Sequence, residues 1–108
     1  MVLQDFVFLD ENDSTGESNP LNCMGARRLI ISVDSESGTT IDLDVFGNVD
    51  FTSDTYFTLG VTNVEDGTLA NSIAANGIYT VDVNGIGRVK IVNNDTPGEA
   101  IVFGRLTD

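Results

Sequence analysis

Apolar and polar residues alternate with a period of two in several separate stretches of the chain. Leu29, Ile31 and Val33 alternate with Ile30, Ser32 and Asp34, and residues 39–46 (TTIDLDVF) alternate even more cleanly. Successive side chains of a β-strand point to opposite faces, so each stretch predicts a strand with one buried face. In the second stretch Ile41, Leu43 and Val45 point inward. Gly47 interrupts the alternation before Val49 and Phe51 resume it, which predicts a β-bulge in one long, bent strand.

The last third of the chain, AANGIYTVDVNGIGRVKIVNNDTPGEAIVFGRLT, has the same character. Three β-type runs are joined by two short connectors of Gly, Asn and Pro, which predicts an antiparallel meander with NGIG as a hairpin turn. The residues expected to face the core are Tyr79, Val81 and Val83 in the first run, Val89 and Ile91 in the second, and Val102 or Phe103 in the third.

The middle of the chain carries shorter signals. TYFTLGV at 55–61 predicts a further strand, and TLANSIAAN at 68–76 predicts a loop or single helical turn that crosses between sheets. The total is seven or eight strands. The expected fold is therefore all-β: a single antiparallel β-sandwich, jelly-roll-like, with an N-terminal arm.

The N-terminal segment has apolar residues on both faces. Neither face of this segment is polar, so it must be buried either at the edge of the sandwich or against a neighbouring molecule. Its apolar residues are Leu3, Phe6, Val7, Phe8 and Leu9. We expect residues 1–20 to form an arm and acidic loop, with those five apolar residues binding a partner, and residues 21–108 to form the sandwich. Removal of residues 1–9 should then leave a folded domain that no longer assembles.

Charge excludes several classes of partner. The 108 residues carry 17 acidic and 5 basic side chains, a formal net charge of −12, which repels nucleic acids and anionic membrane surfaces. The basic residues fall in small groups, each suited either to pairing with local carboxylates or to meeting an acidic partner surface, and we expect the adjacent pair Arg27 and Arg28 to bind a partner. The N-terminus lacks the basic and apolar regions of a secretory signal, so we expect synthesis in a cytoplasm.

Most catalytic templates are missing. The chain has no His, which excludes Ser-His-Asp and Cys-His catalysis and His-ligated zinc. Its one cysteine, Cys23, cannot form an intrachain disulfide, and its neighbours predict a small buried apolar residue. A carboxylate pair suffices for glycoside hydrolysis, but without Trp there is little from which to build a sugar-stacking cleft. We expect no enzymatic activity and no cofactor.

One loop has the spacing of a calcium site. Asp10, Asn12, Ser14 and Glu17 offer oxygen ligands at short intervals, as hard cations require. The match to an EF-hand loop fails because Gly16 comes one position late and residue 21 is Leu where a bidentate Glu belongs. A solvated acidic loop explains the same residues, so we expect no bound metal.

Residues from about 29 to 105 resemble a small β-sandwich module of structural proteins of tailed bacteriophages. The resemblance lies in IISVDSESGTTIDLDVFGNVD, YFTLGV, TLANSIAANGIYTVDVNGIGRVKIVNN and a final strand that ends in Gly-Arg. It covers about three quarters of the chain and consists of turn glycines and alternating apolar residues. Where the module often has an Asp-Gly turn before an aromatic residue, this chain has Asp50-Phe51-Thr52-Ser53-Asp54-Thr55-Tyr56.

The resemblance implies a virion protein without catalytic residues. A capsid decoration or cement subunit is the expected role, bound to the major capsid protein or other virion proteins, with a homo-oligomer, a trimer first, as the expected state. The alternative is a tail or receptor-binding module that recognises host-surface carbohydrate through loops 10–19, 52–55 and 63–67, using Phe51 and Tyr56.

Overall fold

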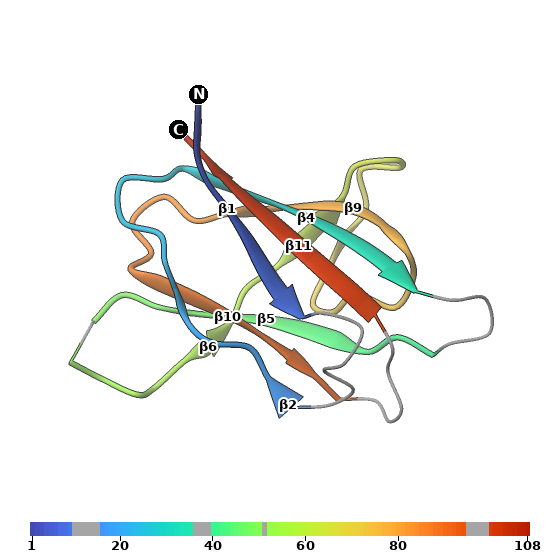
Figure 1. The fold of residues 1–108 in the computed structure, drawn as a ribbon, viewed down its shortest axis with the longest axis horizontal. Coiled ribbons are helices and arrows are strands. Elements are labelled where there is room, and N and C mark those ends of the chain that lie inside the picture. The colour runs from blue at the N-terminus through green and yellow to red at the C-terminus, as the bar shows by residue number, and fades with distance from the viewer. Residues whose placement is uncertain (10–15, 36–39, 51, 95–99) are drawn as a thin grey trace.

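Antiparallel strands assemble into two layers, as the alternation predicts (Figure 1). The computed structural model describes residues 1–9, 16–35, 40–50, 52–94 and 100–108. The six-stranded sheet contains, in spatial order, β1 (Val2–Leu9), β11 (Ala100–Thr107), β4 (Arg28–Ser35), β9 (Gly77–Asp82), β7 (Val61–Asn63) and β8 (Leu69–Ala70). The described residues contain no helix, and in particular none that could cross a membrane.

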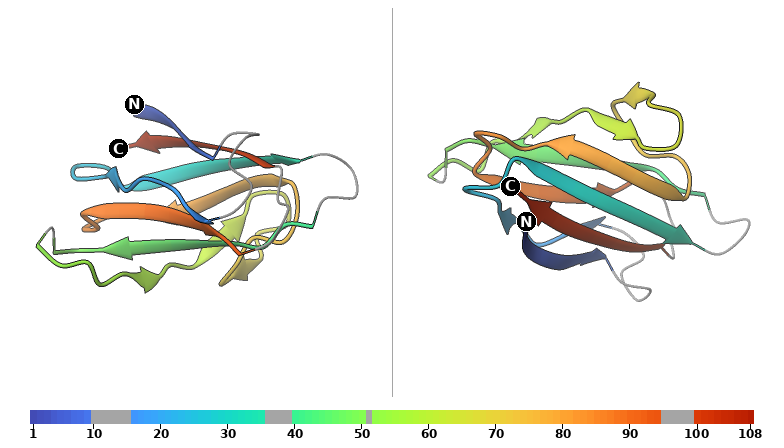
Figure 2. Two further views of the ribbon diagram at one scale, coloured as in Figure 1. Left: turned by 60° about the horizontal axis from the view of Figure 1, so that its bottom comes forward. Right: turned by 90° about the horizontal axis from the view of Figure 1, so that it is seen from above.

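The second sheet lies beneath the first (Figure 2). Its order is β2 (Gly16–Glu17), β10 (Arg88–Asn93), β5 (Leu43–Asn48) and β6 (Phe57–Thr58), and β3 (Leu21–Asn22) also pairs with β10. Every strand pairing among the described residues of both sheets is antiparallel. The prediction of an all-β antiparallel sandwich is confirmed.

The core between the sheets consists of the apolar residues that alternation placed inward. The buried side chains of the six-stranded sheet, together with Val83 directly after β9, include Leu29, Ile31, Val33, Tyr79, Val81, Val102 and Leu106. They face Leu43, Val45, Val89 and Ile91 of the second sheet. Val102 rather than Phe103 is the core residue of the last strand. Burial of apolar area is the main favourable free energy of such a fold.

The predicted meander is wrong. β9 and β11 belong to the six-stranded sheet, where β4 lies between them, and β10 belongs to the other sheet. The NGIG segment therefore carries the chain from one sheet to the other instead of closing a hairpin. Backbone bonds from Val83 N to Arg27 O and from Gly87 N to Asn48 O fasten its two ends to different sheets. Strand alternation looks the same in both arrangements, which is why the pattern could not distinguish them.

Gly47 allows close packing and does not form the predicted β-bulge. The pairing of β5 with β10 runs without a register shift from Leu43 to Asn48, where β5 ends, so the long bent strand is also wrong. A Cβ at Gly47 would lie 2.7 Å from Leu59 Cδ1 and 3.1 Å from Ile86 Cγ2. Glycine is required here because the loops packed on β5 approach its backbone closely. Val49 is exposed, and Phe51 lies outside the described residues.

The central segments are shorter than predicted. The strand expected over 55–61 is divided into β6 and β7, which lie in different sheets. Residues 68–76 contain β8 and then Ile73, which forms a backbone bridge with Leu43 of β5. This segment crosses between the sheets, as expected, and brings the Ile73 side chain into the core.

The predicted arm is a strand of the sandwich. β1 pairs with β11 from Val2 to Leu9, and a register shift between Val7 and Leu9 turns both Phe8 and Leu9 inward, where they are 4% and 2% exposed. Of the two alternatives left by the sequence, the sandwich edge is correct. Phe8 and Leu9 are thus unavailable to a partner, whereas Leu3 and Val7 remain exposed and Phe6 is half-buried.

Candidate interaction surface

The outer face of the six-stranded sheet carries apolar side chains in cross-strand rows. Val7, Phe103, Ser32 and Ile78 are successive Cα partners across β1, β11, β4 and β9. Val7 and Ile78 are each 52% exposed. Ile30 and Ile101 lie on the same face by strand alternation. We call this set, Val7, Ile30, Ile78, Ile101 and Phe103, the apolar rows. Apolar side chains that gather on a partly exposed face are typical of interaction sites on otherwise polar proteins.

An ion pair lies beside the apolar rows. Arg105 of β11 donates to both carboxylate oxygens of its cross-strand neighbour Asp5, at 2.7 and 3.1 Å. The hydrogen bond with Arg105 holds the pKa of Asp5 below its usual range, and the same bond raises the pKa of Arg105. Because both charges are matched, this part of the face is close to neutral despite the acidity of the chain.

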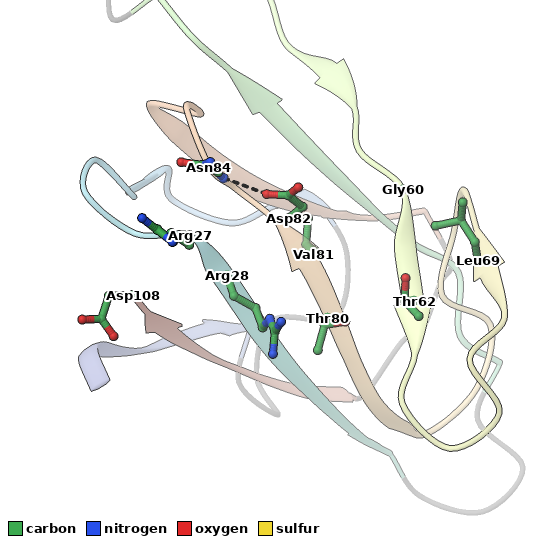
Figure 3. Close-up of a pocket in the computed structure, with 10 residues that line it drawn as sticks. All are labelled: Arg27, Arg28, Gly60, Thr62, Leu69, Thr80, Val81, Asp82, Asn84 and Asp108. Carbon is green, nitrogen blue, oxygen red and sulfur yellow. Dashed lines mark hydrogen bonds between the residues drawn. The ribbon is translucent and has the colours of Figure 1, made fainter. Parts of the chain in front are cut away.

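A groove of about 610 Å³ lies towards the start of β4 on the same sheet (Figure 3). Its lining comprises Arg27, Arg28, Gly60, Thr62, Leu69, Thr80, Val81, Asp82, Asn84 and Asp108. Arg28 extends from β4 towards Thr80 of β9, while β7 and β8 form the opposite side. The predicted basic pair is therefore part of a concave polar surface that adjoins the apolar rows.

Among the described residues, the acidic side chains of this groove have hydrogen-bond partners, whereas the side chains of its two arginines do not. Asp82 accepts a hydrogen bond from the Asn84 backbone N–H at 3.0 Å, and Asp108 accepts one from the N-terminal amine at 2.7 Å, which holds the pKa of Asp108 below its usual range. Within the described residues, neither guanidinium of Arg27 and Arg28 makes a hydrogen bond or an ion pair, and the charge of Arg27 acts only at longer range to lower the pKa of Asp108. The arrangement favours an anionic group from outside the molecule.

The other basic residues serve the fold. Arg88 donates to Asn48 Oδ1 at 3.3 Å and to the Ser53 carbonyl at 2.7 Å, and so fastens loop 52–55 to β10. Lys90 forms an ion pair with Glu17 at 3.0 Å. Both cations lie over the Tyr56 ring, 5.6 and 4.3 Å from its centroid. These cation–π contacts occupy the aromatic residue proposed for carbohydrate binding.

The remaining sequence candidates do not converge on one site. Figure 1 shows loops 52–55 and 63–67 at opposite ends of the sandwich. Asp10, Asn12 and Ser14 lie outside the described residues, and Glu17 is paired with Lys90. In the described part of the chain, no three His, Cys, Asp or Glu side chains are grouped closely enough to hold a metal ion.

Cys23 occupies the core, and its thiol should be inert. It is 1% exposed, its Sγ donates to the Ile86 carbonyl at 3.3 Å, and burial raises its pKa from 9.0 to about 11. The neutral thiol is favoured in the fold, so its contribution to stability is lost as pH rises above 9. We expect Ellman's reagent at pH 8 to label the native chain at least about 100-fold more slowly than the urea-unfolded chain, since thiolate is the nucleophile. Equal labelling rates would contradict this burial.

The apolar rows escaped prediction because they are assembled by topology. Ile78 and Phe103 belong to strands that are adjacent neither in sequence nor in a hairpin, and β4 brings them together. Their only sequence signal is an apolar residue on the outward side of an otherwise alternating strand.

Comparison with known proteins gives fold likenesses only. No protein-family model and no curated protein matches the chain. The crystal structure of YomS, a protein derived from the SPBc2 prophage, matches with a TM-score of 0.83 and 20% identity, over 95% of this chain and 90% of YomS. The exported protein XepA of PBSX matches with a TM-score of 0.85 and 22% identity. That match covers 95% of this chain but 37% of XepA. The chain thus shares its sandwich fold with two prophage proteins.

Proposed function

We propose that the chain is a non-enzymatic structural protein of a bacteriophage particle, most specifically a decoration subunit bound to the major capsid protein lattice. The observation that carries the proposal is the fold likeness to YomS, which extends over nearly all of both chains. The apolar rows and the groove with Arg27 and Arg28 supply a docking surface. A rigid sandwich that presents one partly apolar face is suited to adding onto an assembled lattice.

The test is where the protein is found after phage growth. We expect it to co-purify with density-gradient particles of the phage that encodes it, at a fixed ratio to the major capsid protein by quantitative mass spectrometry. Recovery only from particle-free fractions would contradict the proposal.

A second candidate follows from the description of XepA as exported. If this chain is likewise an exported phage protein, it will accumulate in the particle-free medium before lysis. The same fractionation separates the two functions. The carbohydrate-binding alternative gains no support from the fold, because Tyr56 is engaged by Arg88 and Lys90 and its hydroxyl oxygen is buried.

The basic groove gives a further expected result. Replacing both arginines, Arg27→Gln with Arg28→Gln, should weaken binding to particles about 2- to 30-fold, because two exposed ion pairs are typically worth about 0.2–1 kcal/mol each. The effect should diminish at high salt. Co-sedimentation at two salt concentrations measures it. The control, Thr55→Glu with Thr58→Glu, changes net charge equally at exposed positions near β6. An equal loss with the control would show that net charge alone matters.

A further inference from the structure

The edges of the two sheets differ sharply in length. β8, β2 and β6, which stand at three edges, have two residues each, whereas β1 has eight. An edge strand presents unpaired N–H and C=O groups, and its ability to receive another strand grows with its length. Within the described residues β1 pairs only with β11, so its outer edge is the one long open edge of this part of the molecule.

β1 also lacks the usual protection of an exposed edge. It contains neither proline nor lysine, and its single charged residue, Asp5, is matched by Arg105. Val2, Leu3 and Val7 are exposed along it. Proteins normally blunt such edges with charge, proline or short length. An open, neutral and apolar edge in a chain of net charge −12 is suited to binding another strand.

We propose that the outer edge of β1 binds an extended segment of a different protein by β-augmentation. Register shifts at Val2/Gln4 and Val7/Leu9 limit regular pairing to residues 4–7, so the bound segment is short. Main-chain hydrogen bonds supply affinity, and side chains of the segment meet Val7 and, beyond the regularly paired residues, Leu3. This inference extends the proposed function. It rests on that function only for the identity of the partner, which we take to be a protein of the phage particle.

Self-pairing of β1 is disfavoured by charge. In the antiparallel register that sets Leu3 opposite Val7, the two copies of Asp5 lie directly opposite each other. Like charges directly opposite each other destabilise a strand pair, and each copy also brings a charge of −12. The partner segment is therefore apolar at alternate positions and neutral or basic opposite Asp5.

A peptide selection tests this inference without phage particles. The immobilised full chain is presented with a library of random linear 12-residue peptides, and enriched peptides are measured by titration. We expect alternating apolar residues without central acids. Binding should fall at least 10-fold in the Leu3→Lys/Val7→Lys variant and stay unchanged in the matched control Val49→Lys/Val64→Lys, whose positions are exposed and away from β1.

A backbone readout makes the result specific to strand pairing. Single N-methylation along a selected peptide should abolish binding to the unmodified chain at alternate positions only, because alternate amides of an edge-paired strand donate to the neighbour. Failure to enrich any peptide, equal binding by the Leu3→Lys/Val7→Lys variant, or an N-methylation pattern without alternation would overturn the inference. A chain that binds such peptides but never associates with particles would retain this inference and lose the proposed function.

Discussion

Deletion of residues 1–9 should abolish the cooperative folded state. The deletion removes one of the two strands that pair with β11 and takes the buried Phe8 and Leu9 out of the core. Truncating a buried Phe or Leu typically costs about 2–5 kcal/mol each, and the two together approach the about 5–15 kcal/mol that stabilises a small domain. Urea unfolding followed by far-UV circular dichroism measures the effect.

A point substitution separates the core contribution from the loss of the strand. Phe8→Ala should lower the free energy of unfolding by about 3–5 kcal/mol, whereas Val7→Ala, one residue away and exposed, should change it by less than about 1 kcal/mol. The opposite outcome, a truncated chain that unfolds cooperatively with nearly full stability, would restore the original expectation of a dispensable arm.

Gly104→Ala should also destabilise the fold, because Phe8 packs directly on this glycine. A Cβ at residue 104 would overlap the edge of the Phe8 ring and lie 3.3 Å from Leu29 Cδ1. The ring cannot turn away freely, since it also packs edge-on against Phe6 with centroids 5.0 Å apart. Overpacking of this kind typically costs about 1–3 kcal/mol, which denaturant unfolding will show.

A double-mutant cycle tests the cause. In a Phe8→Leu background the smaller side chain leaves room, so Gly104→Ala should cost at least about 1 kcal/mol less than in the natural chain. Gly60→Ala serves as the control, because its nearest neighbour is the side chain of the exposed Leu69, at 3.2 Å. Additive costs in the cycle would exclude Phe8 as the source of the strain.

The sequence predicted correctly which residues of several strands face the core, but it did not predict which sheet each strand belongs to. Alternation identified the inward residues of β4, β5, β9 and β10, because a strand with one wet face must keep its register. It could not show that β9 and β10 lie in different sheets, since a turn between sheets and a hairpin turn use the same Gly and Asn residues. The N-terminal strand was ambiguous for a similar reason. Its apolar residues Phe6, Phe8 and Leu9 predict burial, but they do not indicate whether this chain or another molecule buries them.

The candidate surface was predicted in part. Arg27 and Arg28 were identified because they are adjacent cations in an acidic chain, and the structure places both in one groove. The apolar rows depend on β4 separating β11 from β9, a neighbour relation that no local pattern contains. Leu3 and Val7 remain candidates for partner contact, now as side chains of a strand edge and not of a free arm.

The outer face of the six-stranded sheet is the docking surface that we propose for a phage particle. Rebinding of the purified chain to particles that lack it, quantified by co-sedimentation, tests this most directly. We expect saturable binding that Ile78→Lys weakens at least 10-fold and that Val49→Lys, at a more exposed apolar position away from this face, leaves unchanged. Absence of binding, or equal binding by the Ile78→Lys variant, would contradict the account.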